Sequence, residues 1–154
     1  MTEKDISDPK VGVALVLTCM DLRVLDEAAD YLEALKLTNE YDHFVLAGAA
    51  LGVTQTQKPA WGETFWDHLG LAIGLHQISK VFIFEHQDCG AYKKLVPDEA
   101  ARWSNGADEK ACHHGYATAL QKEILRRHAG VITDVELRYI AIEQGTVNGH
   151  VETF

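Results

Sequence analysis

Two cysteines and one histidine, far apart in the chain, have the side chains and local spacing of zinc ligands. Cys19 opens the run Cys-Met-Asp-Leu-Arg, and His86 and Cys89 stand three residues apart in His-Gln-Asp-Cys-Gly. Zinc prefers thiolate sulfur and imidazole nitrogen, and three protein ligands leave a fourth tetrahedral position for water. That open position is typical of a catalytic rather than a structural zinc site. Asp21 and Arg23 add a carboxylate and a guanidinium just beyond Cys19.

The elements predicted around these residues place each of them at the end of a strand. Residues 11–17 form a continuous apolar run, which is typical of a strand buried on both faces and leads directly to Cys19. Residues 80–85 are dense in β-branched and aromatic side chains and predict a similar strand that ends at His86. Further strands are expected at 43–47 and 135–142, and helices at 26–37, 62–79 and 109–128. Loops are expected at 48–60 and 96–109, and a turn after the last strand at 145–149.

The alternation of strands and helices predicts an α/β fold, with a mostly parallel β-sheet flanked by helices. In such sheets, ligands collect beyond the carboxyl ends of the strands. Cys19 follows the first strand, and His86 and Cys89 follow the third, so the two halves of the proposed site are expected to meet. On the residues alone an alternative stays open, in which both cysteines are small buried hydrophobic residues and the histidine is a satisfied polar one.

The two motifs, in this order, resemble those of the β-class carbonic anhydrases, and the match looks closest to the short bacterial members. That family has Cys-x-Asp-x-Arg after its first strand and His-x-x-Cys-Gly after a later one. Here the two motifs are residues 19–23 and 86–90, and the likeness extends over nearly the whole chain. The resemblance implies a β-carbonic-anhydrase-like fold and a zinc enzyme that reversibly hydrates carbon dioxide to bicarbonate.

The resemblance also implies a role for each residue of the site. The expected zinc ligands are Cys19, His86 and Cys89. Zinc-bound hydroxide would attack carbon dioxide, with Asp21 accepting the hydroxide's proton in a hydrogen bond and Arg23 holding that carboxylate ionised and oriented. Gly48 and Gly90 are expected to contact the substrate. Because sites of this family form near subunit contacts, a homodimer or a larger homo-oligomer is implied.

Two departures from the family pattern keep other functions open. The family commonly has Arg-Asn-Ala-Gly after its second strand, whereas this chain has Val-Leu-Ala-Gly at residues 45–48, and Leu22 stands where a small residue is usual. Both changes make the neighbourhood more apolar. One alternative is therefore a hydrolase of carbonyl sulfide or carbon disulfide on the same scaffold, and another is a zinc-binding homologue without turnover. A thiol redox protein is disfavoured because the chain has no Cys-x-x-Cys.

Length, charge and cysteine count narrow the class of protein and its partners. The 154 residues suffice for one domain with a real core, and we expect a polar tail over residues 1–10 and a single zinc-binding domain over residues 11–154. With 14 basic and 23 acidic side chains the formal charge is -9, which argues against nucleic acid or membrane partners and leaves a small-molecule substrate. The lack of a leader or an apolar span, and the odd count of three cysteines, predict a reduced, cytoplasmic protein.

Several other polar residues near the motifs are given structural interpretations. The run Cys-His-His at residues 112–114 looks like a second metal cluster, but neighbouring helical positions point in different directions. A solvated histidine pair at a helix start is therefore preferred. Asp88 suits either a hydrogen bond near the metal or a solvated turn, and Tyr92 and Lys93 are interpreted as surface residues.

Overall fold

A five-stranded sheet forms the centre of the structure, a computed structural model that describes residues 11–143 and 149–154. Its strands are β1 (Ala14–Thr18), β2 (Tyr41–Val45), β3 (Lys80–His86), β4 (Asp134–Ile142) and β5 (Gly149–Thr153). They lie in the order β2-β1-β3-β4-β5, with the first four parallel and β5 antiparallel to β4. The predicted α/β fold with a mostly parallel sheet is confirmed.

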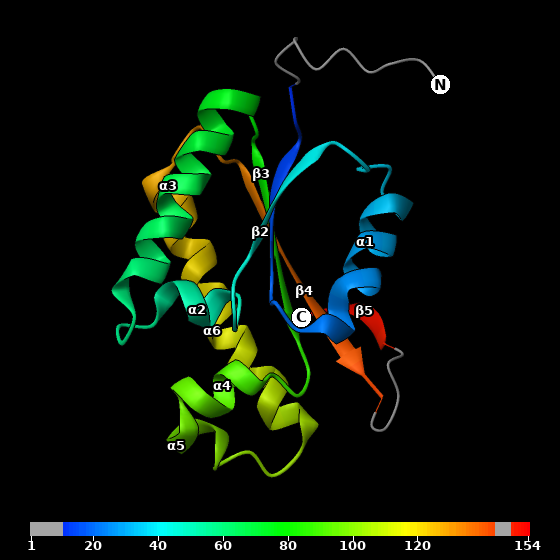
Figure 1. Ribbon diagram of the computed structural model, residues 1–154, viewed down its shortest axis with the longest axis vertical. Helices are drawn as coiled ribbons and strands as arrows, with labels where there is room; N and C mark the ends of the chain where they lie inside the picture. Colours follow the sequence, from blue (N-terminus) through cyan, green and yellow to red (C-terminus); the bar gives the residue numbers. More distant parts are fainter. Residues whose placement is uncertain (1–10, 144–148) are drawn as a thin grey trace.

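Helices cover both faces of this sheet (Figure 1). They are η1 (Leu22–Val24), α1 (Leu25–Ala34), α2 (Ala50–Thr54), α3 (Pro59–His76), α4 (Gly90–Leu95), α5 (Pro97–Ala100) and α6 (Gly106–Arg127). α2, α3 and α6 lie on one side and α1 on the other. The side chains of β1 alternate accordingly: Leu15 and Leu17 join the core under the first group, and Ala14 and Val16 join the core under α1. Within the described residues no helix is both long and apolar enough to cross a membrane.

Each strand and helix expected from the sequence is present, with its ends shifted by a few residues. The loops expected at 48–60 and 96–109 are wrong in part, because the first contains α2 and the start of α3, and the second contains α5 and the start of α6. β4 is not the last strand, because β5 pairs with it. The predicted tail over residues 1–10, and all but the last residue of the turn at 145–149, lie outside the described residues. The single domain over residues 11–154 stays a prediction.

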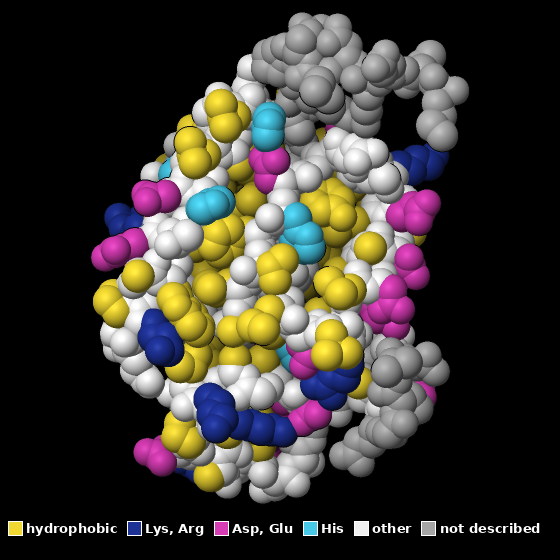
Figure 2. Space-filling view, in the orientation of Figure 1, with side chains coloured by type: hydrophobic (Ala, Val, Ile, Leu, Met, Phe, Trp, Pro, Cys, Tyr) yellow, Lys and Arg dark blue, Asp and Glu magenta, His cyan; other side chains and the backbone are white. Residues whose placement is uncertain are grey.

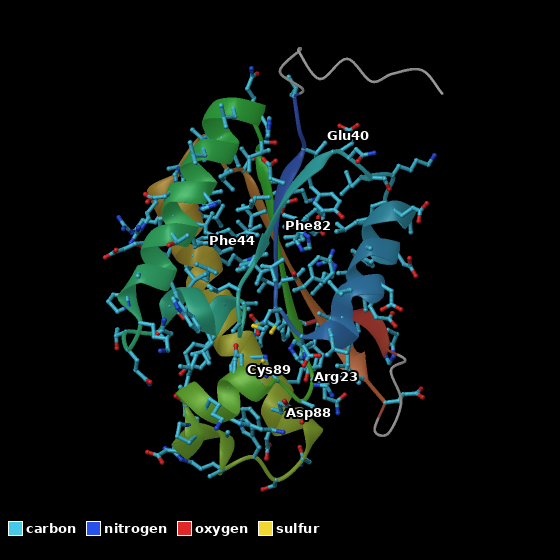
Figure 3. All side chains as sticks on the ribbon, in the orientation of Figure 1. Arg23, Glu40, Phe44, Phe82, Asp88 and Cys89 are labelled. Atoms are coloured by element: carbon cyan, nitrogen blue, oxygen red, sulfur yellow. The ribbon has the colours of Figure 1, made fainter. Side chains whose placement is uncertain are left out.

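The sheet order explains how the two motifs meet. β1 and β3 are direct neighbours and run in the same direction, with Leu17 paired to Ile83 near their carboxyl ends. The chain segments that leave these two strands therefore emerge side by side. In Figure 3 Arg23, Asp88 and Cys89 lie close together at this end of the sheet, whereas Glu40 lies at the opposite end.

Candidate metal centre

Cys19, His86 and Cys89 converge on one point at the carboxyl ends of β1 and β3. One ligand atom from each lies within 4.8 Å of the others, and the two sulfurs are 3.9 Å apart. All three residues are buried, with 4%, 2% and 1% of their surfaces exposed. Zinc–sulfur bonds of about 2.3 Å at a tetrahedral angle require sulfurs roughly 3.8 Å apart, so the observed separation fits zinc.

The imidazole of His86 is oriented as a metal-ligating ring. Its Nδ1 lies 2.8 Å from the backbone carbonyl of Gln87, which assigns the proton to that nitrogen. Its Nε2 is buried and has no hydrogen-bond partner among the described residues. A buried acceptor nitrogen without a partner is costly, and a ligating histidine characteristically donates its other N–H to a carbonyl. The donor set of two sulfurs and this nitrogen therefore fits a thiophilic divalent ion.

The two thiols differ in how readily they ionise. The hydrogen bond from the Cys89 thiol lowers the pKa of Cys19 against the opposing effect of burial, and His86 and the Gly48 amide lower it further. The same contact with Cys19, together with burial, raises the pKa of Cys89. Cys19 therefore ionises before Cys89. Because thiolate is the form of cysteine that binds metal, metal binding would also require Cys89 to lose its proton.

Asp21 and Arg23 form the carboxylate–guanidinium pair expected beside the metal ligands. Arg23 donates from Nε to Oδ1 of Asp21 at 3.0 Å and from Nη2 to Oδ2 at 2.8 Å, and its backbone N–H also reaches Oδ1 at 3.0 Å. These hydrogen bonds lower the pKa of Asp21 to about 2. The carboxylate is therefore ionised at neutral pH and held at both oxygens.

Arg23 also joins the first motif to the second. Its Nη1 donates to Oδ2 of Asp88 at 3.0 Å, and its Nη2 donates to the Asp88 carbonyl at 3.0 Å. Asp88 has a positive φ of 58° and also pairs with Lys93. Both interpretations of Asp88 hold, because it is an exposed turn residue that also hydrogen-bonds near the metal ligands. Figure 3 shows Arg23, Asp88 and Cys89 grouped in this region.

An open cavity of about 580 Å³ lies against the metal ligands and is bounded mainly by apolar side chains. Its lining comprises Cys19, Met20, Asp21, Leu22, Arg23, Ala47, Lys58, Trp61, Cys89, Gly90, Ala91, Lys94 and Leu95. Gly90 is thus part of the wall, whereas the Gly48 amide donates to Sγ of Cys19 at 3.4 Å. Substrate contact by these two glycines stays a prediction. The cavity can receive a small uncharged molecule beside the metal position.

Two residues interpreted as solvated or surface residues are buried instead. Tyr92 and His113 are both 0% exposed, and each contacts the carboxylate of Glu85, whose own exposed fraction is 1%. His114 and Lys93 are exposed, as expected. The signal for His113 was its helical spacing, because it lies four residues before Ala117 on the face of α6 that packs on the sheet.

Comparison with known proteins gives one family and two relatives. A family model described as “Putative carbonic anhydrase” matches residues 10–109, which include both motifs. The chain is 33% identical to an uncharacterized protein of Rickettsia bellii over 99 residues, which are 64% of this chain and 59% of that protein. It is also 33% identical to an uncharacterized protein of Rickettsia conorii over 85 residues, which are 55% of this chain and 46% of that protein. The chain thus spans about half the length of these curated relatives.

Proposed function

The chain belongs to the family described as “Putative carbonic anhydrase”, and we propose that it is a zinc-dependent carbonate dehydratase that interconverts carbon dioxide and bicarbonate. One observation carries the proposal: two sulfurs 3.9 Å apart and the unpartnered Nε2 of His86 converge beside an apolar cavity. Cys19, His86 and Cys89 would hold the ion. When bound, zinc supplies a Lewis acid that brings the pKa of coordinated water close to neutrality.

The residues around the ligands suit this reaction. Asp21 is ionised at neutral pH, so its carboxylate can accept a hydrogen bond from the reacting water and orient it. Arg23 fixes that carboxylate at both oxygens and keeps it from turning. The apolar walls of the cavity, among them Trp61 and Leu95, suit an uncharged substrate such as carbon dioxide.

A second candidate is hydrolysis of carbonyl sulfide or carbon disulfide at the same site. Leu22 and Met20 stand at the cavity and are 78% and 68% exposed, so its entrance is apolar. Val45 stands where the family commonly has arginine, so a cation at the end of β2, two residues before Ala47 in the cavity lining, is absent from this chain. Both features suit a small uncharged substrate and disfavour binding of an anion such as bicarbonate.

We also propose that the protein works as a homo-oligomer in the cytoplasm. Met20, Leu22 and Leu25 are large, exposed hydrophobic residues within six positions of the chain, and the first two line the open cavity. A second copy covering them would close the site on that side. Figure 2 shows further hydrophobic side chains over the middle of one face. All three cysteines are free, which suits a reducing compartment.

The test of this function combines metal content with rate measurements on the purified protein. We expect about one zinc per chain by elemental analysis, and carbon dioxide hydration well above the buffer rate by stopped-flow measurement. Asp21→Ala should lower the rate while zinc is retained, and Asp30→Ala, at an exposed position of α1, should not. Bound zinc with sulfide release from carbonyl sulfide, but no hydration of carbon dioxide, would favour the second candidate. Bound zinc with neither activity would identify a zinc-binding protein without turnover.

A further inference from the structure

A cluster of buried ionisable side chains lies next to the metal centre and belongs to none of its ligands. Glu85, at the end of β3, is 1% exposed, and Glu109 and His113, on α6, are 8% and 0% exposed. Burying a carboxylate or an imidazole costs free energy unless its polar atoms find partners. The hydrogen bonds of these two carboxylates and the histidine therefore indicate what the buried cluster does.

Glu85 holds the loop that contacts Cys19. Its Oε1 accepts the Ala50 N–H at 2.8 Å, and its Oε2 accepts hydrogen bonds from the Tyr92 hydroxyl at 2.9 Å and from Nδ1 of His113 at 2.8 Å. Ala50 opens α2 two residues after Gly48, whose amide donates to Sγ of Cys19. The position of this donor on the thiolate thus depends on where the Glu85 carboxylate is held.

Glu109 holds the loop that carries Cys89. Its Oε1 accepts the backbone N–H of Asp88 at 2.7 Å. Asp88 directly precedes Cys89 and receives the two hydrogen bonds from Arg23. The second half of the metal centre is therefore fixed by a carboxylate on α6, just as the first half is fixed by a carboxylate on β3.

His113 stands between these two carboxylates. Its Nδ1 is 2.8 Å from Oε2 of Glu85. Its Nε2 has no hydrogen-bond partner among the described residues and lies 3.7 Å from Oε1 of Glu109, a contact that is an ion pair when the ring is protonated. The ring is stacked on Tyr92, with centroids 3.7 Å apart and planes 24° apart, and the edge-to-face contact with Tyr139 limits it further. The orientation of the imidazole is thereby determined by packing on its faces as well as by the carboxylates at its nitrogens.

We propose that His113 is a positioning residue of the metal centre, which links Glu85 and Glu109 and so keeps the Gly48–Ala50 loop and the Asp88–Cys89 loop in register with each other. The inference rests on the proposed metal site, but it does not require that carbon dioxide is the substrate. It assigns a role outside the ligand set to a residue 24 positions beyond the last ligand. Groups that hydrogen-bond a metal ligand directly contribute about ten- to a hundredfold to metal affinity. His113 acts further out, through Glu85 and Glu109, so we expect its contribution at or below the lower end of that range.

The first test measures zinc binding by His113→Phe, which keeps an aromatic ring on Tyr92 but removes both ring nitrogens. We expect zinc affinity, from competition with a chromogenic chelator, to fall by about tenfold, and the thiolate-to-metal absorption of the cobalt-substituted protein to change. The matched control is His114→Phe at the exposed neighbouring position, which should bind zinc as the wild type does. A folded His113→Phe protein with wild-type zinc affinity and an unchanged cobalt spectrum would overturn the proposal.

The second test uses His113→Asn and keeps the proposal open to refutation if the phenylalanine variant does not fold. Asparagine can place an amide N–H where Nδ1 stands, but it has nothing to face Glu109. We expect backbone hydrogen exchange at Asp88 and Cys89 to become faster, with exchange at Ala50 unchanged. The zinc affinity of His113→Asn should be lower than that of the wild type. If His113→Phe folds, its zinc affinity should be lower still. Unchanged exchange at Asp88 would refute the link through His113.

These readouts separate the inference from the proposed function. If the wild-type protein binds zinc but does not hydrate carbon dioxide, the proposed function fails, and the zinc affinities and exchange rates still decide the role of His113. If the wild-type protein binds no zinc, the metal centre and this inference fall together. If it hydrates carbon dioxide and His113→Phe binds zinc normally, only the inference is wrong.

Discussion

Replacing Arg23 by lysine keeps one positive charge but removes the planar guanidinium group that binds both carboxylate oxygens of Asp21. In the structure Nε and Nη2 of Arg23 occupy the two carboxylate oxygens, at 3.0 and 2.8 Å, while Nη1 and Nη2 reach Asp88, each at 3.0 Å. Lysine presents a single ammonium group on a flexible stem and cannot bind both oxygens of Asp21 and the Asp88 loop in one geometry. Arg23→Lys should therefore leave Asp21 ionised but poorly oriented.

The expected loss follows from the hydrogen bonds that lysine cannot replace. A hydrogen bond to a charged group contributes about 1.5–3 kcal/mol. We assume that the transition state is destabilised by the free energy of one such hydrogen bond when Asp21 is poorly oriented. Since each 1.36 kcal/mol is a factor of ten, kcat/KM then falls by about 10- to 150-fold. Because the Arg23 side chain is 26% exposed, solvent weakens the pair, and we expect a value in the lower half of this range.

The assay is stopped-flow hydration of carbon dioxide with a pH indicator, with zinc content measured on the same samples. Arg102→Lys, at an exposed position away from Asp21, is the matched control and should keep the wild-type rate. An Arg23→Lys protein with full zinc and an unchanged kcat/KM would refute the reasoning that the guanidinium group orients Asp21. Loss of zinc in this variant would instead mean that the contacts to Asp88 hold the second ligand loop.

Three further predictions concern the metal, pH and the backbone. Cys19→Ser and Cys89→Ser should each lose stoichiometric zinc by elemental analysis, because serine replaces a soft thiolate ligand; full occupancy in either would contradict the ligand set. Arg23 lowers the pKa of Asp21 from 3.8 to about 2, so the ionised carboxylate stabilises the folded protein above pH 3.8, and this contribution is lost as pH falls towards 2. In denaturant titrations Asp21→Asn should therefore be less stable than the wild type near neutral pH, with the two converging near pH 2; a pH-independent difference would be evidence against the ion pair. Gly48→Ala should lower the free energy of unfolding by about 1–2 kcal/mol, because φ is +76° there and the new Cβ would lie 3.2 Å from that of Ala91; unchanged stability would show that the loop can relax.

Two simple rules predicted that the ligands lie at the same edge of the sheet. Apolar runs at residues 11–17 and 80–85 identified buried strands, and parallel strands present their carboxyl ends at one edge. Cys19 and His86 directly follow those runs, so their meeting required only that β1 and β3 lie near each other in the sheet. That adjacency could not be derived from strand order along the chain, because β2 comes between them in sequence and lies at the edge in space.

The errors arise where tertiary contacts override local patterns. β5 is a short strand of mixed polarity whose pairing is decided by the free edge of β4. α2 begins after Ala49, which has a positive φ of 44°, and its burial rather than its propensity makes it helical. The burial of Tyr92 could not be read from its neighbours Ala91 and Lys93, because it depends on a hydrogen bond to Glu85 on another element.

His113 was missed for a different reason, since its periodicity was visible. The buried positions of α6 are Glu109, His113, Ala117, Leu120 and Ile124, which form one helical stripe with polar residues at its first two positions. If only apolar residues are counted, the buried stripe of α6 begins at Ala117, and the turns before it are predicted to face solvent. A polar pair at i and i+4 that continues an apolar stripe needs partners inside the fold. Here Glu109 accepts from the Asp88 amide and Nδ1 of His113 contacts Glu85, whereas Nε2 of His113 has only the 3.7 Å contact with Glu109. Such a continuation therefore indicates a buried polar site.

The two motifs are coupled by direct contacts within the protein. Arg23, from the first motif, reaches Asp88 in the second, and the Gly48 amide reaches Sγ of Cys19 from a third segment. Each contact crosses between elements that adjoin one another only because β1 lies between β2 and β3. A substitution that shifts any one of these loops should therefore change the ligand geometry and the orientation of Asp21 together, since Arg23 takes part in both. This coupling makes the Cys-x-Asp-x-Arg and His-x-Asp-Cys-Gly patterns one structural unit.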